Sequence, residues 1–99
     1  MNRAEVIARL QTLELQLRER GVAAMHLFGS YARDEGGPDS DLDIFVDPID
    51  EDAFGLVPFV ETLTALQRNF PGVEIGFSTR EGIAPSYRPW IEQGALRVF

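Results

Sequence analysis

The sequence predicts a two-layer α/β (α+β) domain in which a small mixed β-sheet packs against helices. Helical and strand-like apolar patterns alternate along the 99 residues, as they do in domains that layer helices on a sheet. Apolar residues make up 44% of the chain, which suffices for a core, and the length fits one domain over residues 1–99. The chain has no cysteine, which excludes disulfides and thiolate metal sites.

The elements are predicted from apolar spacing, which is three or four residues in helices and two in strands. In chain order, helices are expected near residues 3–20, 30–34, 56–70 and 86–93, and strands near residues 22–28, 42–46, 73–77 and 95–99.

Turn and cap residues set the limits of the first half. Gly21 is a natural stop for the first helix. Ser30 is a suitable N-cap for the short helix that follows the first strand, and residues 36–39 (GGPD) form a loop. Pro48 ends the second strand.

Proline and acidic residues set the limits of the second long helix. The acidic run at residues 50–52 favours a helix N-terminus, and Pro58 must lie in the first turn, so the helix is expected to start near Leu56 or Val57. Pro71 and the following glycine end it. The apolar side chains that this helix is expected to bury are Leu56, Phe59, Val60, Leu63, Leu66 and Phe70.

Alternation sorts the side chains of the third strand. Val73, Ile75 and Phe77 are expected on the core face and Glu74 on the opposite face. Three aromatic residues, Phe54, Trp90 and Phe99, are interpreted as core or interface residues.

A glycine-serine turn and two aspartates predict the functional site. Gly29-Ser30 follows the first strand, and Asp41 and Asp43 bracket one leucine at the start of the second. On a strand the two carboxylates share a face, about 7 Å apart, where they suit a hard cation better than a core. A turn that offers backbone N–H groups and a hydroxyl suits phosphate oxygens. Together these residues predict a site for a metal–triphosphate.

The same residues resemble a known family. The pattern G-S-x10-D-x-D, in the local forms G-S-Y-A-R and S-D-L-D-I, resembles the minimal nucleotidyltransferases of the polymerase-β-like superfamily. The resemblance implies that fold and Mg²⁺-dependent transfer of a nucleoside monophosphate, AMP from ATP, to an acceptor hydroxyl. It implies that Asp41 and Asp43 bridge two Mg²⁺ ions and that Gly29, Ser30 and Arg33 bind the nucleotide.

Two positions depart from the family pattern. Glu74 stands where the family usually has a third aspartate; it would complete the metal site and help to deprotonate the acceptor, or it is an ordinary exposed strand residue. Asp34 stands where the family often has glycine, and it lies near the phosphates or points to solvent. Arg33 binds a phosphate or forms a surface ion pair with Asp34, Glu35 or Asp39.

The resemblance also implies a partner. Larger members of the superfamily carry a second, acceptor-binding domain, for which this length leaves no room, so the acceptor is expected to be another molecule. The minimal family commonly occurs with a helical HEPN-type ribonuclease toxin, adenylylates a tyrosine on it and so acts as an antitoxin. The alternative is a catalytically weak or inactive module that keeps the fold for partner binding, which the two departures favour.

Charge and hydropathy exclude other classes. The net charge is −7, all nine basic residues are arginine, and nine of the sixteen acidic residues lie between Asp34 and Asp52. Such a surface repels nucleic acid, which is bound through basic contacts to phosphate. Neither an apolar leader nor a spanning stretch is visible, so no membrane association and a cytoplasmic location are expected.

Overall fold

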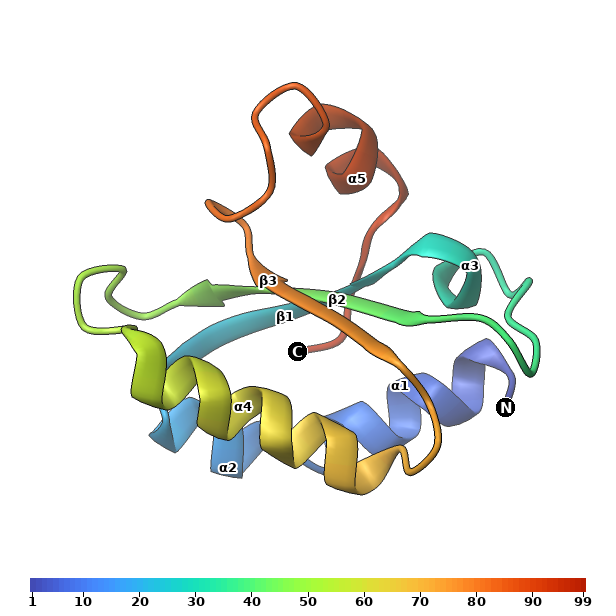
Figure 1. The fold of residues 1–99 in the computed structure, drawn as a ribbon, viewed down its shortest axis with the longest axis horizontal. Helices are drawn as coiled ribbons and strands as arrows, with labels where there is room; N and C mark the ends of the chain where they lie inside the picture. Colours follow the sequence, from blue (N-terminus) through green and yellow to red (C-terminus); the bar gives the residue numbers. More distant parts are fainter.

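The computed structural model describes all residues from 1 to 99 and contains one mixed sheet (Figure 1). In chain order the elements are α1 (Arg3–Gln11), α2 (Glu14–Glu19), β1 (Val22–Phe28), α3 (Gly29–Ala32), β2 (Leu42–Pro48), α4 (Leu56–Asn69), β3 (Ile75–Thr79), α5 (Arg88–Gly94) and β4 (Leu96–Arg97).

The sheet has the strand order β3-β2-β1-β4. β1 is antiparallel to both of its neighbours, whereas β2 and β3 are parallel and are joined by the α4 crossover that a parallel pair requires. Figure 1 shows α1, α2 and α4 on one side of the sheet and α5 over the other side. The predicted mixed sheet packed against helices is confirmed. None of the helices combines the length and hydropathy needed to cross a bilayer.

The core lies between the sheet and the helices α1, α2 and α4. Its largest fully buried aliphatic side chains are Val6, Leu10, Leu17, Val22, Met25, Leu27, Leu42, Ile44, Val46 and Leu66, and Phe70 is nearly as buried. The predicted apolar face of β3 is confirmed, because Ile75 and Phe77, with Val73 before them, pack against this core. The opposite face of the sheet carries Asp43 and Asp47 of β2, with the buried Phe45 between them.

The predicted first helix is two helices. The Thr12 hydroxyl donates a hydrogen bond to the Arg9 carbonyl (2.6 Å), and the Leu13 N–H donates to the Leu10 carbonyl (3.0 Å), one residue closer than in a regular α-helix. A threonine hydroxyl that bonds the backbone competes with the helical pattern, so the turn tightens here. The apolar stripe survives the break, because Leu10, Leu13 and Leu17 are all buried.

The predicted N-caps of α3 and α4 are wrong. α3 begins at Gly29, whose positive φ of 75° turns the chain directly after β1, so Ser30 lies within the helix. α4 begins at Leu56 as expected, but its N-cap is Gly55. Asp50 instead closes a local turn by accepting a hydrogen bond from the Asp52 N–H at 3.0 Å.

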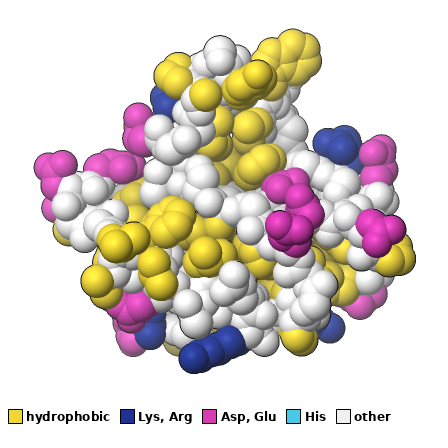
Figure 2. All heavy atoms as spheres, in the orientation of Figure 1, with side chains coloured by type: hydrophobic (Ala, Val, Ile, Leu, Met, Phe, Trp, Pro, Cys, Tyr) yellow, Lys and Arg dark blue, Asp and Glu magenta, His cyan; other side chains and the backbone are white.

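The buried part of α4 is shorter than its apolar pattern predicts. Leu56 and Val60 at its beginning are exposed, and so is Val57, whereas Ala65 and Leu66 in its second half are buried. Figure 2 shows hydrophobic side chains gathered on the surface over the beginning of this helix. Helical spacing identifies an apolar stripe, but it does not show how much of the helix length overlaps the sheet.

The C-terminal elements differ from prediction mainly in their limits. β3 begins two residues later than expected, and α5 begins at Arg88, with Pro89 in its first turn. β4 has only two residues, although the Val98 N–H and the Phe99 carbonyl still bond the backbone of Met25. Phe99 is buried and Phe54 packs against the core as expected, but Trp90 is 79% exposed and is not a core residue.

Candidate active site

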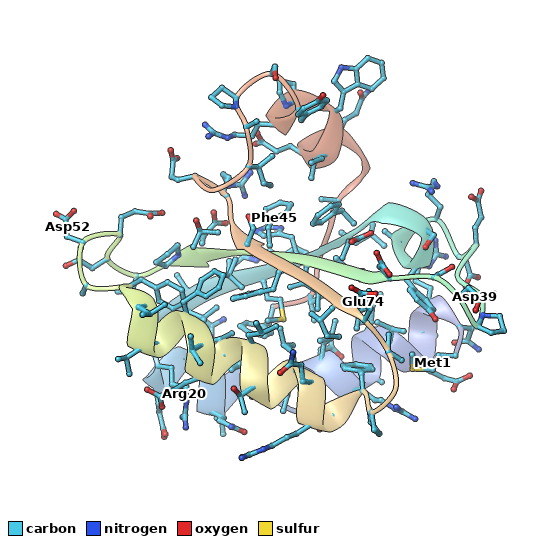
Figure 3. The ribbon with its side chains drawn as sticks, in the orientation of Figure 1. Met1, Arg20, Asp39, Phe45, Asp52 and Glu74 are labelled. Atoms are coloured by element: carbon cyan, nitrogen blue, oxygen red, sulfur yellow. The ribbon has the colours of Figure 1, made fainter.

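The three carboxylates singled out in the sequence lie on the same face of the sheet, opposite the helical layer. Leu42 is fully buried in the core, so Asp41 and Asp43 on either side of it face the other way. Leu42 pairs with Ile75 across the parallel strands, which places Glu74 next to Asp41. Figure 3 shows Glu74 toward the α3 end of the sheet, and Figure 2 shows acidic side chains gathered there.

The carboxylate of Asp43 lies between two glycines. One is Gly29, at the start of α3, where a Cβ would collide with the Asp43 Oδ2 atom. The other is Gly76, which pairs with Asp43 across the sheet, and where a Cβ would lie only 2.6 Å from Oδ1. Gly29 was expected from the sequence to serve the phosphates; the structure adds that it makes room for the aspartate.

Burial and like charge act together on Asp43. Partial burial and, secondarily, the charge of Asp41 raise the pKa of the Asp43 carboxyl, while the guanidinium of Arg33 opposes this effect. No hydrogen bond from a protein group contributes to stabilising the charge. A half-buried carboxylate beside another carboxylate, with no donor of its own, fits a cation that both could bind.

Glu74 is exposed, so its side chain is free to change rotamer. As the side chains stand, no group of three His, Cys, Asp or Glu residues is close enough to hold a metal ion. The structure thus brings Asp41, Asp43 and Glu74 to one face without closing them around one point.

Arg33, near the glycine-serine turn, forms one of the surface ion pairs predicted for it, the pair with Glu35. Arg33 is exposed, and its Nε atom lies 3.2 Å from the Glu35 carboxylate, a pair whose two side chains are both more than half exposed. Such a pair contributes little energy, so it does not prevent Arg33 from contacting a bound anion.

Asp34 faces away from the expected phosphate position. Its Oδ1 accepts a hydrogen bond of 2.9 Å from the backbone N–H of Arg3 at the start of α1. Its φ of 58° is in the left-handed region, which glycine and, less often, aspartate adopt. This backbone conformation explains why the position can hold either residue.

A second polar cluster on the same face was not found from the sequence. Arg80 donates from Nε and Nη2 to both oxygens of Asp47 (2.7 and 2.9 Å) and from Nη1 to Glu92 of α5 (2.6 Å). The His26 ring lies 2.9 Å from Asp47 and stacks on Phe45, which Figure 3 shows on the side of the sheet that faces α5. The hydrogen bonds from Arg80 lower the pKa of Asp47. This cluster connects α5 and the end of β3 to β2.

We expect Gly29→Ala to damage both the fold and the site. Alanine at a φ of 75° is strained, and its Cβ would displace the Asp43 carboxylate. The expected cost is about 1–3 kcal/mol of unfolding free energy, with weaker binding of divalent metal by the folded fraction. Urea denaturation and metal titration would measure the two effects. Gly94→Ala, where a Cβ meets nothing within 4 Å, is the matched control; equal stability of the two variants would contradict the expectation.

Comparison with known proteins finds a matching family model and similar solved structures. The family model described as a nucleotidyltransferase domain matches residues 10–56, which include β1, α3 and β2 and therefore Gly29, Ser30 and both aspartates. A solved structure described as that of a candidate minimal nucleotidyltransferase matches with a TM-score of 0.82 and 28% sequence identity, over 97% of this chain and 95% of that chain. No curated protein matches the chain significantly.

Proposed function

We propose that the chain transfers a nucleoside monophosphate, AMP from ATP, to a hydroxyl on an acceptor, with release of pyrophosphate. The match of the nucleotidyltransferase family model to residues 10–56 and the similar solved structure support this proposal. The observation that carries this proposal is the pair Asp41 and Asp43 on the open face of the sheet. Asp43 is seated against the glycine that begins α3, and its charge lacks a protein donor. The close approach of Gly29 to the Asp43 carboxylate supports a site shared by the turn and the aspartates.

The chain's own residues have separate tasks in this reaction. Asp41 and Asp43 would hold Mg²⁺, and the bound ion would neutralise charge on the triphosphate and on the attacking and leaving oxygens. Gly29 and Ser30 would contact phosphate oxygens through backbone N–H groups and the hydroxyl. Arg33 would leave its ion pair with Glu35 and contact a phosphate oxygen instead. Glu74 would turn toward the aspartates and accept the proton of the acceptor hydroxyl.

The acceptor we propose is a tyrosine hydroxyl on a separate helical protein of the HEPN toxin type, so that the domain acts as an antitoxin in the cytoplasm. Support for this step comes from the resemblance of the sequence motifs to minimal nucleotidyltransferases. Transfer of label from [α-³²P]ATP to a co-purified partner, with and without Mg²⁺, tests it directly. Label that stays in ATP with the genuine partner present would reject it.

A second candidate function is partner binding without catalysis. It is favoured by the separation of the three carboxylates, which do not form a metal-holding group, and by the exposure of Glu74. The same labelling experiment distinguishes the two functions.

We expect Mg²⁺ and ATP to stabilise the protein together more than either does alone. A ligand that binds only the folded state raises stability with its concentration, by roughly 2.7 kcal/mol at a hundredfold excess over Kd. The acidic site should repel ATP without a cation, because Asp41 and Asp43 are both negative. Thermal melting with each ligand alone and with both would measure this. The metal-site assignment fails if ATP binds as tightly in EDTA as in millimolar Mg²⁺.

Glu74→Gln should remove most of the transfer activity, because an amide neither balances metal charge nor accepts a proton. Glu74→Asp, which restores the usual family residue, should keep or raise the activity. Partner binding should survive both changes, since the side chain is exposed and away from the core. Steady-state rates and a pull-down of the partner would measure the two properties. If Glu74→Gln transfers nucleotide at the parent rate, the third carboxylate is another residue.

A further inference from the structure

The position of the Asp43 carboxylate depends on a residue outside the expected motifs. Gly76 lies directly across the parallel strands from Asp43, and its missing Cβ would stand 2.6 Å from Oδ1 and 4.0 Å from the Cα of Asp43. Any side chain at position 76 must therefore push the carboxylate away from β3. The neighbouring atom is the end of a movable side chain, so the fold itself can adjust.

The same empty space lies beside Glu74. Residues two apart on a strand point to the same face, about 7 Å from each other. Glu74 and Gly76 are such a pair, and the positions across from them are Asp41 and Asp43. Because Gly76 has no side chain, nothing attached to β3 stands between Glu74 and Asp43. Glutamate, with one more methylene than aspartate, needs this space to bring its carboxylate to the metal.

We propose that Gly76 is a positioning residue, whose missing side chain leaves room over β3 for the carboxylates of Asp43 and Glu74 to meet at one metal. This inference rests on the proposed function and explains how a glutamate can serve at position 74. Gly29 limits the other side of the Asp43 carboxylate, so the two glycines determine where the carboxylate lies.

The test is a double-mutant cycle of Gly76→Ala and Glu74→Asp, with Mn²⁺ alone as the probe and the electron paramagnetic resonance signal of the free ion as the readout. Gly76→Ala should weaken Mn²⁺ binding about tenfold, the loss typical of removing a support of a metal ligand. In the Glu74→Asp background the same change should still weaken Mn²⁺ binding, because an alanine Cβ displaces the Asp43 carboxylate in either background. The loss should be smaller than in the parent, because the shorter side chain does not use the space above residue 76. A purely structural role of Gly76 would not be relieved by a change at residue 74.

Three outcomes would overturn the inference. They are unchanged Mn²⁺ affinity in Gly76→Ala, an equal loss in both backgrounds, and unfolding of Gly76→Ala in EDTA, which would make the residue a requirement of the fold. Gly94→Ala is the control and should bind Mn²⁺ as the parent does. If the parent itself binds no Mn²⁺, or Asp43→Asn binds it equally well, the proposed function fails; if only the Gly76 variants behave as the parent, the inference fails alone.

Discussion

Asp43→Asn should reduce nucleotidyl transfer by about a hundred- to a thousandfold, the usual effect of removing a group that stabilises transition-state charge. The protein should at the same time be as stable as the parent, or more stable, in metal-free buffer. The reason is that the Asp43 carboxylate is partly buried and repelled by Asp41, so the amide removes an unfavourable charge along with a metal ligand.

The raised pKa of Asp43 predicts the direction in which stability changes with pH. The folded-state pKa of Asp43 is raised, so the folded protein binds more protons than the unfolded chain between the two pKa values. The contribution of Asp43 to stability therefore falls as pH rises from its ordinary value near 3.8 through the raised value. Asp43→Asn should remove this decline, and Mg²⁺ should stabilise the parent but not the variant.

Melting temperatures across the acidic range, with EDTA or Mg²⁺, and initial transfer rates would measure these effects. Asp52→Asn is the matched control, because Asp52 is exposed and Figure 3 shows it at the far end of the molecule from Glu74. A variant that melts well below the parent in EDTA would show that Asp43 is structural and that the site is misassigned.

Arg80→Met should lower the free energy of unfolding by about 2 kcal/mol. Arg80 bonds both oxygens of Asp47, contacts Glu92 and lies over the Phe45 ring, 4.9 Å from its centre. Methionine keeps most of the packing on the ring, but it leaves Glu92 without its arginine partner and Asp47 with His26 as its only side-chain partner. In a domain of this size the melting temperature should fall by roughly 10 °C.

The pH dependence for this cluster has the opposite sign. The pKa of Asp47 is lowered, chiefly by its hydrogen bonds from Arg80, so its stabilisation is present above the ordinary carboxyl pKa and is lost as pH falls through the lowered value. In Arg80→Met, stability should therefore fall less steeply as the pH is lowered. Arg33→Met, which breaks only the exposed pair with Glu35, should melt close to the parent. Equal melting temperatures of the two variants would contradict a stabilising role for Arg80.

Local pattern predicted the parts of the site that lie on single strands. Alternation alone placed Asp41, Asp43 and Glu74 on the face away from the core. The reason is that the apolar Leu42 lies between the two aspartates and the apolar Ile75 follows Glu74. It could not show that the three side chains stand apart, since rotamers and strand register are properties of the assembled sheet.

The remaining features depend on contacts between distant residues. Arg80 is 33 residues from Asp47 and 54 from His26, and no spacing in the sequence connects such partners. The signals in the sequence were Asp47, a charged residue on β2 like Asp43, and His26, a polar residue within β1. Gly76 likewise has meaning only once β3 pairs with β2. The fold class, by contrast, follows from element order and could be predicted.

The strand order has a consequence for how firmly the three carboxylates are held. β2, which carries Asp43, is bonded on both sides, whereas β3 is an edge strand that pairs only with β2 and has no fully buried residue. Edge elements with little burial open at a lower free energy than the whole domain. Detachment of β3 would withdraw Glu74 and leave the two aspartates in place. The number of carboxylates at the site thus depends on a local unfolding equilibrium of β3. A protein that binds β3 and holds it in the sheet would raise metal affinity without contacting the metal.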